Sequence, residues 1–111
     1  MEKKVELKDL VGYSKLILDK KILKKIKKVK DKEEKKDLLI HLIKKELEMI
    51  HYDIVRKVRK LEIKGKDIFS IEVKSSLLQT KINYFVINFN KKDFKNLILL
   101  IIDIKKEMKN V

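Results

Sequence analysis

A carboxylate and an ammonium group lie two residues apart within one short apolar segment of the chain. The segment reads IFSIEVKSS over residues 68–76, and its polar pair is Glu72 and Lys74. Side chains alternate between the two faces of a β-strand, so both would project from the same face. With a second carboxylate nearby, two acids can hold a hard cation such as Mg²⁺. The lysine can then orient a water molecule or stabilise charge on phosphate. This pattern predicts metal-dependent phosphodiester hydrolysis.

Asp53 is the candidate for the second carboxylate, 19 residues before Glu72. Together with Glu72 and Lys74 it resembles the PD-(D/E)xK nuclease superfamily over residues 46–76. Members carry an acid at the start of one strand, a variable hairpin, and (D/E)-x-K on the next strand. The resemblance implies a Mg²⁺-dependent DNA endonuclease, or a degenerate relative. Asp53 and Glu72 would hold the metal and Lys74 would assist catalysis.

Several features of the chain bear on this resemblance. Some superfamily members add a glutamate from the preceding helix, and either Glu46 or Glu48 would fill that place. Asp53 has no proline before it, and the chain ends before a full superfamily core is complete. The alternative interpretation of Glu72 and Lys74 is a salt-bridge pair on a solvated sheet face, where such pairs contribute about 0–1 kcal/mol.

Other polar and aromatic residues give weaker signals. His41 and His51 are ten residues apart with no obvious third ligand, so we expect no metal site there. Phe85, Phe89 and Tyr84 lie in one apolar segment and could stack on bases. We favour a core role for them, because the chain has only seven aromatic residues to pack.

The first half of the chain shows helical spacing of apolar residues. Residues 7–29 and 38–50 repeat at steps of three and four, which predicts helices, and Asp31 or Asp37 can cap the second. Beyond residue 50 the pattern fits either a helix that continues to Leu61 or a strand over 52–58. The position of Asp53 depends on this choice.

The second half favours strands. Residues 68–73 and 82–89 are rich in β-branched and aromatic residues, and Gly65 indicates a hairpin-type turn. Asn90 is typical of a helix cap for residues 94–108, although 97–104 also fits a buried strand. The sequence therefore predicts an α/β fold of the α+β type: N-terminal helices, a small β-sheet, and a C-terminal helix or strand.

The charge of the chain favours a nucleic-acid partner. Thirty Lys and Arg oppose 17 Asp and Glu, for a net charge of +13, enough to attract a polyanion. Only Arg56 and Arg59 are arginines, so side-chain readout of bases is not expected. Lysine codon bias in an AT-rich genome is the alternative explanation. The residues predicted to bind nucleic acid, DNA in the first place, are Lys20, Lys21, Lys24, Lys25, Lys27, Lys28, Arg56 and Arg59.

Length and composition exclude several classes. With 111 residues the chain predicts one domain, residues 1–111. It has no cysteine, so disulfide scaffolds, zinc fingers and thiol chemistry are excluded. Its longest apolar run, Leu97 to Ile102, is too short for a bilayer span. We therefore expect a cytoplasmic protein.

Two other functions fit the predicted element order. One is a non-catalytic DNA-binding protein of winged-helix type, with residues 67–75 and 80–89 as the wing and the helix over 94–108 pairing two subunits as a homodimer. The other is a protein-interaction module whose charge reflects composition alone. A strand at residues 52–58 favours the nuclease, whereas a helix through Leu61 favours the binding proteins.

Overall fold

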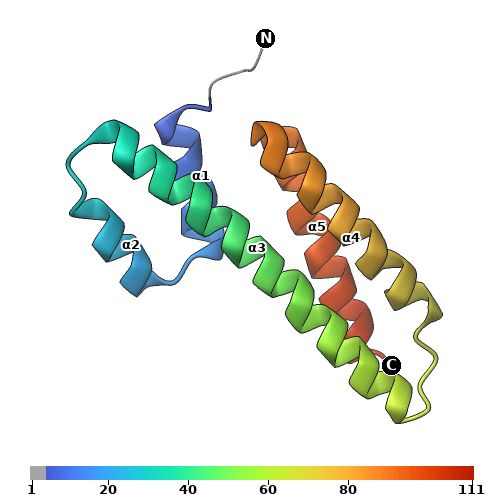
Figure 1. The fold of residues 1–111 in the computed structure, drawn as a ribbon. Helices are drawn as coiled ribbons and strands as arrows, with labels where there is room; N and C mark the ends of the chain where they lie inside the picture. The colour runs from blue at the N-terminus through green and yellow to red at the C-terminus, as the bar shows by residue number, and fades with distance from the viewer. Residues whose placement is uncertain (1–4) are drawn as a thin grey trace.

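The computed structural model describes residues 5–111 and contains five helices, with no strand in that range (Figure 1). The helices are α1 (Leu7–Ile17), α2 (Lys20–Lys27), α3 (Lys32–Ile63), α4 (Phe69–Asn88) and α5 (Lys91–Lys109). The expected α/β fold is therefore wrong, and the described chain is all-α. The helices predicted in the first half are confirmed, whereas the small β-sheet is not.

The N-terminal segment forms two helices where one helical pattern was recognised. At Leu18 the backbone becomes extended, and its N–H bonds back to the carbonyl oxygen of Ser14, which closes α1. Asp19 then caps α2 by accepting a hydrogen bond from the backbone N–H of Lys21. A side-chain cap of this kind satisfies one of the donors left free at a helix start. The chain can therefore turn here without a proline or glycine.

The long helix α3 settles the ambiguity after residue 50. Its N-cap is Asp31, whose side chain accepts from the backbone N–H of Glu33 at 2.9 Å. The helix then continues without interruption to Ile63, so of the two alternatives left open for residues 52–58 the helix is confirmed and the strand is wrong. Gly65 follows in the left-handed region at φ +81°, and the turn there joins two helices instead of two strands.

Both strands expected in the second half, over 68–73 and 82–89, are wrong: these residues form the two ends of α4, with Ile68 as its N-cap and Phe89 as its C-cap. The spacing of the buried residues explains why this segment is a helix. It steps by three or four along the helix, at Ile71, Ser75, Leu78, Ile82 and Phe85, which is the period of one helix face. Next, Asn90 caps α5 as predicted, with its side chain accepting from Lys92 N–H. The expected helix over 94–108 is thus confirmed, and a strand over 97–104 is not.

An aromatic cluster ties the two halves of the chain together. The rings of Tyr13, Phe85, Phe89 and Phe94 pack with centroids 4.4–5.5 Å apart. The Tyr13 hydroxyl donates a buried hydrogen bond of 2.8 Å to the carbonyl oxygen of Phe89. Phe89 itself ends α4 in the left-handed conformation, at φ 51°. Phe85 and Phe89 are therefore core residues as we favoured, while Tyr84 is 68% exposed.

The helices form a flat, elongated arrangement. In Figure 1 α3 runs the length of the molecule, with α1 and α2 beside its first half and the antiparallel pair α4 and α5 beside its second half. The Cα atoms extend over 51 × 34 × 16 Å. Several helices keep large apolar side chains exposed to solvent, among them Ile63, Phe69 and Tyr84. None of the five helices combines the length and apolarity of a membrane span.

Candidate functional site

Glu72 and Lys74 point to opposite sides of α4. Side chains two residues apart lie on the same face of a strand. In a helix they are rotated by about 200° relative to one another around the helix axis. Glu72 accordingly borders a groove against α3, whereas Lys74 reaches α5. The shared face that we predicted for this pair does not exist in the helix.

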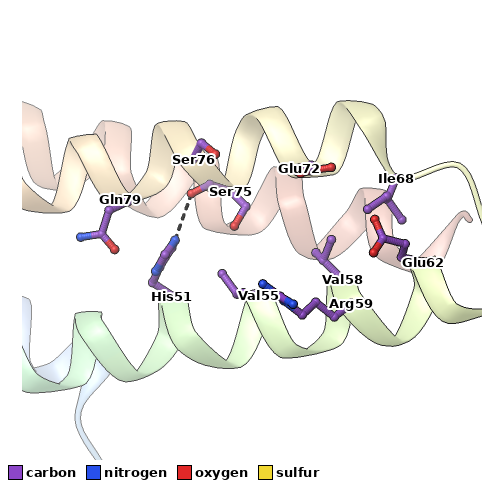
Figure 2. Close-up of a pocket in the computed structure, with 10 residues that line it drawn as sticks. All are labelled: His51, Val55, Val58, Arg59, Glu62, Ile68, Glu72, Ser75, Ser76 and Gln79. Carbon is purple, nitrogen blue, oxygen red and sulfur yellow. Dashed lines mark hydrogen bonds between the residues drawn. The ribbon is translucent and has the colours of Figure 1, made fainter.

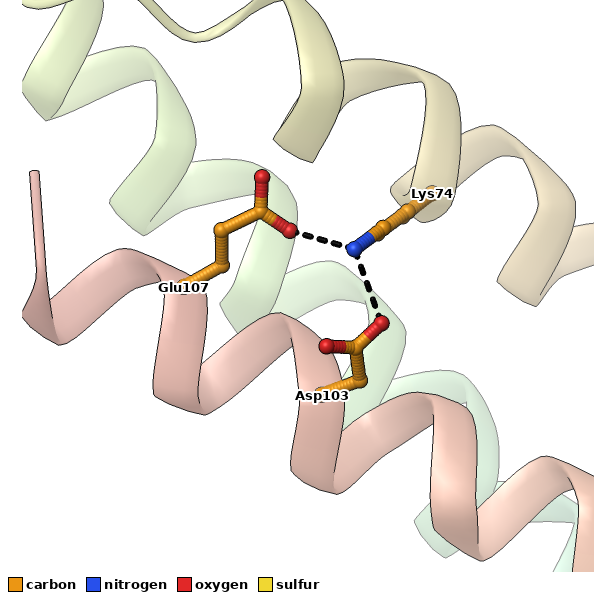
Figure 3. A network of polar contacts seen from close by, with 3 residues as sticks. All are labelled: Lys74, Asp103 and Glu107. Atoms are coloured by element: carbon orange, nitrogen blue, oxygen red, sulfur yellow. Dashed lines mark hydrogen bonds and ion pairs between the residues drawn. The ribbon is translucent and has the colours of Figure 1, made fainter.

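Lys74 is held by two acids of α5 (Figure 3). Its Nζ lies 2.8 Å from Oδ2 of Asp103 and 2.6 Å from Oε2 of Glu107. Hydrogen bonds to Asp103 and then Glu107 raise the pKa of the Lys74 ammonium. The pKa of the Glu107 carboxyl is lowered, mainly by the hydrogen bond from Lys74 and next by the hydrogen bond from Ser70. An ammonium with a raised pKa is a poor proton acceptor near neutral pH.

Asp53 has a different set of neighbours. It lies on the exposed side of α3 and pairs with Lys57 one turn later, at 3.1 Å, where both side chains are more than half exposed. Of the alternative glutamates, Glu46 is half-buried and Glu48 is exposed on the same helix. Residues 5–111 contain no group of three or more His, Asp or Glu side chains able to hold a metal ion. The Mg²⁺ site expected at Asp53 and Glu72 therefore stays a prediction, and Asp53 has Lys57 as its partner in the structure.

The groove beside Glu72 lies between α3 and α4 (Figure 2). It has a volume of about 480 Å³ and is lined on one side by His51 and Arg59 and on the other by Glu72 and Ser75. The Nε2 of His51 is 3.1 Å from the backbone oxygen of Ser75. Because a carbonyl oxygen can only accept, the histidine donates here. His51 therefore joins α3 to α4, and His41, on the same helix, is exposed.

The clearest charged surface of the molecule is the basic segment, which we define as residues 20–30. It contains seven lysines and no acid, all of them exposed. They are Lys20, Lys21, Lys24, Lys25, Lys27, Lys28 and Lys30. None of the four ion pairs of residues 5–111 involves them. On the other side of α2, Ile26 is buried and Ile22 and Leu23 pack against the core.

The two arginines predicted to bind nucleic acid are not part of the basic segment. Arg56 and Arg59 lie in the second half of α3. At about 1.5 Å per residue, Arg56 is some 36 Å along the helix from Lys32, the first residue of α3. Arg59 lines the groove described above, and Arg56 is exposed. The predicted nucleic-acid residues therefore divide between two regions of the molecule.

A second basic surface was not recognised from the sequence. Lys57 and Lys60 of α3 and Lys105 and Lys109 of α5 surround a groove of about 400 Å³. Its apolar floor is formed by Leu61 and Met108. The spacing of lysines within either helix is ordinary for this chain. Only the fold, in which α3 and α5 line the same groove, brings the four together.

Comparisons with known proteins leave the site to be judged on its own geometry. No protein-family model, no curated protein and no solved structure matches the chain.

Proposed function

We propose that this protein binds nucleic acid, duplex DNA in the first place, through the basic segment and without catalysing its cleavage. The observation that carries the proposal is the set of seven exposed lysines in residues 20–30 with no acid among them and no ion-pair partner in residues 5–111. They account for more than half of the net charge of +13. Such a surface attracts phosphates and releases the counterions condensed on DNA.

The packing of α2 supports an interaction with phosphate. A basic amphipathic helix can also bind a membrane, but that requires its apolar side to be available. Here Ile26 is 3% exposed and belongs to the core, so the side of α2 that faces solvent is the lysine side. Lysine is a point charge without the planar fork of arginine. The proposed binding is therefore electrostatic and largely independent of sequence.

The surroundings of the predicted catalytic residues support a binding role over a nuclease. Lys74 is neutralised by Asp103 and Glu107, and Asp53 pairs with Lys57. A metal-dependent hydrolase needs two acids close to one cation. The nuclease suggested by the sequence resemblance stays a prediction, and a cleavage assay tests it.

Fluorescence anisotropy with a labelled DNA duplex, repeated over a range of salt concentrations, tests the binding proposal. The variant combines Lys24→Gln, Lys25→Gln and Lys28→Gln. The control combines Lys92→Gln, Lys95→Gln and Lys106→Gln on α5, which removes the same charge from equally exposed positions. Glutamine and lysine have similar helix propensities, so both triple variants should fold.

The proposal expects the first variant to lose affinity and to reduce the salt slope by about 3, since each phosphate contact contributes roughly 0.9 to it. The α5 control should change much less. Equal losses in the two variants would show that binding follows total charge and has no site. No binding by the unaltered protein at low salt would overturn the proposal.

A further inference from the structure

The side of α4 that faces away from the core is apolar and exposed. We call this surface the outer face of α4. Its members and their exposed fractions are Phe69 74%, Val73 53%, Leu77 45%, Tyr84 68% and Ile87 72%. Only Glu72, Lys74 and Lys81 are charged among the 20 residues of α4, in a chain that is 42% charged. Lysine codon bias does not explain a solvent-facing surface without lysine.

The spacing on this face is that of a helix-pairing seam. Val73, Leu77, Thr80, Tyr84 and Ile87 follow one another at steps of four, three, four and three. This is the 3.5-residue repeat that keeps one stripe of a helix against a partner helix. From Phe69 to Ile87 the stripe is about 27 Å long. A groove of about 220 Å³ lined by Leu77, Tyr84 and Asn96, among others, runs beside it and can receive side chains of a partner.

We propose that the outer face of α4 pairs with the same face of a second copy of this chain, with the two α4 helices antiparallel. The proposal goes beyond nucleic-acid binding and does not depend on it. In this arrangement a two-fold axis passes between Leu77 and Thr80. Each Val73 then lies opposite Tyr84 of the second copy, and each Ile87 lies opposite Ser70 of the second copy, next to Phe69. A self-complementary patch of this kind is what a two-fold dimer requires.

Charge complementarity favours a second copy in that register. Lys74, Asp103 and Glu107 together carry a net charge of −1 beside the stripe. Lys81 lies two helical turns after Lys74, on the same side of α4, and takes part in none of the ion pairs of residues 5–111. The antiparallel register places Lys81 of each copy opposite the acidic cluster of the other. Two extra attractive contacts would therefore border the apolar seam.

The exposed area also suits a dimer. An aromatic side chain buries about 150–250 Å², so Phe69 and Tyr84 alone offer roughly 200–350 Å². With three aliphatic residues the patch reaches or exceeds the roughly 300–600 Å² of the largest patches on ordinary monomers. Thr80 and the 54% exposed Leu99 of α5 extend it toward the roughly 800 Å² per partner of a stable interface.

Sedimentation equilibrium of the full chain, without DNA, tests the pairing. We expect a dimer that dissociates at least about tenfold more readily in the double variant Leu77→Lys and Tyr84→Lys. The control is Leu16→Lys with Met49→Lys, two exposed apolar residues outside α4, which should leave dimerisation unchanged. All four positions are exposed, and circular dichroism checks that each variant stays folded.

Disulfide trapping tests the antiparallel register, because the chain has no cysteine of its own. Single variants Val73→Cys and Tyr84→Cys are oxidised separately and then as a mixture. The proposed register predicts a cross-linked product in the mixture and little in either variant alone. A parallel pairing would cross-link each variant to itself and would overturn the proposed arrangement.

Two further outcomes would overturn the pairing itself. One is a monomer at every concentration up to the solubility limit. The other is a monomer that binds vesicles of phosphatidylcholine and phosphatidylserine and loses this binding in the Leu77 and Tyr84 variant, which would make the outer face of α4 a membrane contact. Binding of DNA through α2 would be unaffected by either outcome, so the two proposals fail separately.

Discussion

Lys74 and Glu107 form the shortest ion pair of the described chain, with Nζ 2.6 Å from Oε2. The pair joins α4 to α5 over 33 positions of sequence. Asp103, one turn before Glu107, contacts the same ammonium at 2.8 Å. The lysine that the sequence offers as a catalytic group is thus part of a contact between two helices. Asp103 and Glu107, and not Glu72 of the Glu-x-Lys motif, are the acids that contact the Lys74 ammonium.

This ion pair predicts a pH dependence of stability. The folded state lowers the pKa of Glu107 below the ordinary 4.5, so the pair contributes stability fully above that pH. The contribution is lost as the pH falls through the lowered value. We expect Glu107→Gln to have a lower urea midpoint than the unaltered protein at pH 7. The difference between the two midpoints should become smaller as the pH falls below 4.5. Glu48→Gln, on the exposed side of α3, is the control. A gap that stays constant with pH would contradict the ion pair.

The hydroxyl of Tyr13 should contribute measurably to folding. Tyr13→Phe leaves the buried carbonyl oxygen of Phe89 without its donor, and an unsatisfied buried polar group costs about 1–3 kcal/mol. Tyr52→Phe removes an exposed hydroxyl and should change the free energy of unfolding by less than about 0.5 kcal/mol. Urea denaturation of both variants provides the comparison. Equal stabilities would argue against the Tyr13 hydrogen bond.

The two glycines should respond to alanine with opposite signs. Gly12 lies inside α1, and an added Cβ would meet no atom within 4 Å. Gly12→Ala should therefore stabilise the protein by about 0.5–1 kcal/mol. Gly65 has a φ of +81°, which alanine adopts only with strain, so Gly65→Ala should destabilise it by about 1 kcal/mol. Thermal melts decide the point, and two changes of the same sign would be inconsistent with the turn after α3.

A cleavage assay separates binding from catalysis. Plasmid and single-stranded DNA are incubated with the protein in Mg²⁺, in Mn²⁺ and in EDTA, alongside Glu72→Ala. Because Asp53 and Lys74 have partners of their own, we expect no metal-dependent cutting and unchanged DNA binding by the variant. Metal-dependent cutting that Glu72→Ala abolishes would instead establish the nuclease.

The starts of α3 and α5 could be predicted from the sequence, because a helix cap depends only on neighbouring residues. Asn90 and Asp31 each bond to a backbone N–H two residues later, and such contacts need no knowledge of the rest of the fold. Residues 68–89 were misread because isoleucine, valine and phenylalanine favour strands in short windows. A longer window reveals the helix, since the buried positions from Ile71 to Phe85 keep the helical step.

The predicted site could not be judged from sequence in the same way. The strand reading put Glu72 and Lys74 on one face, and the correct helix separates them. The partners of Lys74 lie 29 and 33 positions later. Helix caps and apolar periodicity concern neighbouring residues, so they cannot predict such a contact between two helices. The basic segment was recognised correctly as a charged surface, because seven lysines in 11 residues must expose their charges wherever the helix packs.

The contact between Tyr13 and Phe89 also sets an order of events during synthesis of the protein. The two residues are 76 positions apart, which a ribosome covers in roughly 4–15 s at about 5–20 residues per second. Throughout that interval Tyr13 exists without the three phenylalanines that surround it in the finished molecule. A nascent chain interrupted before α4 would lack all three phenylalanines and would display this side of α1 to chaperones and proteases.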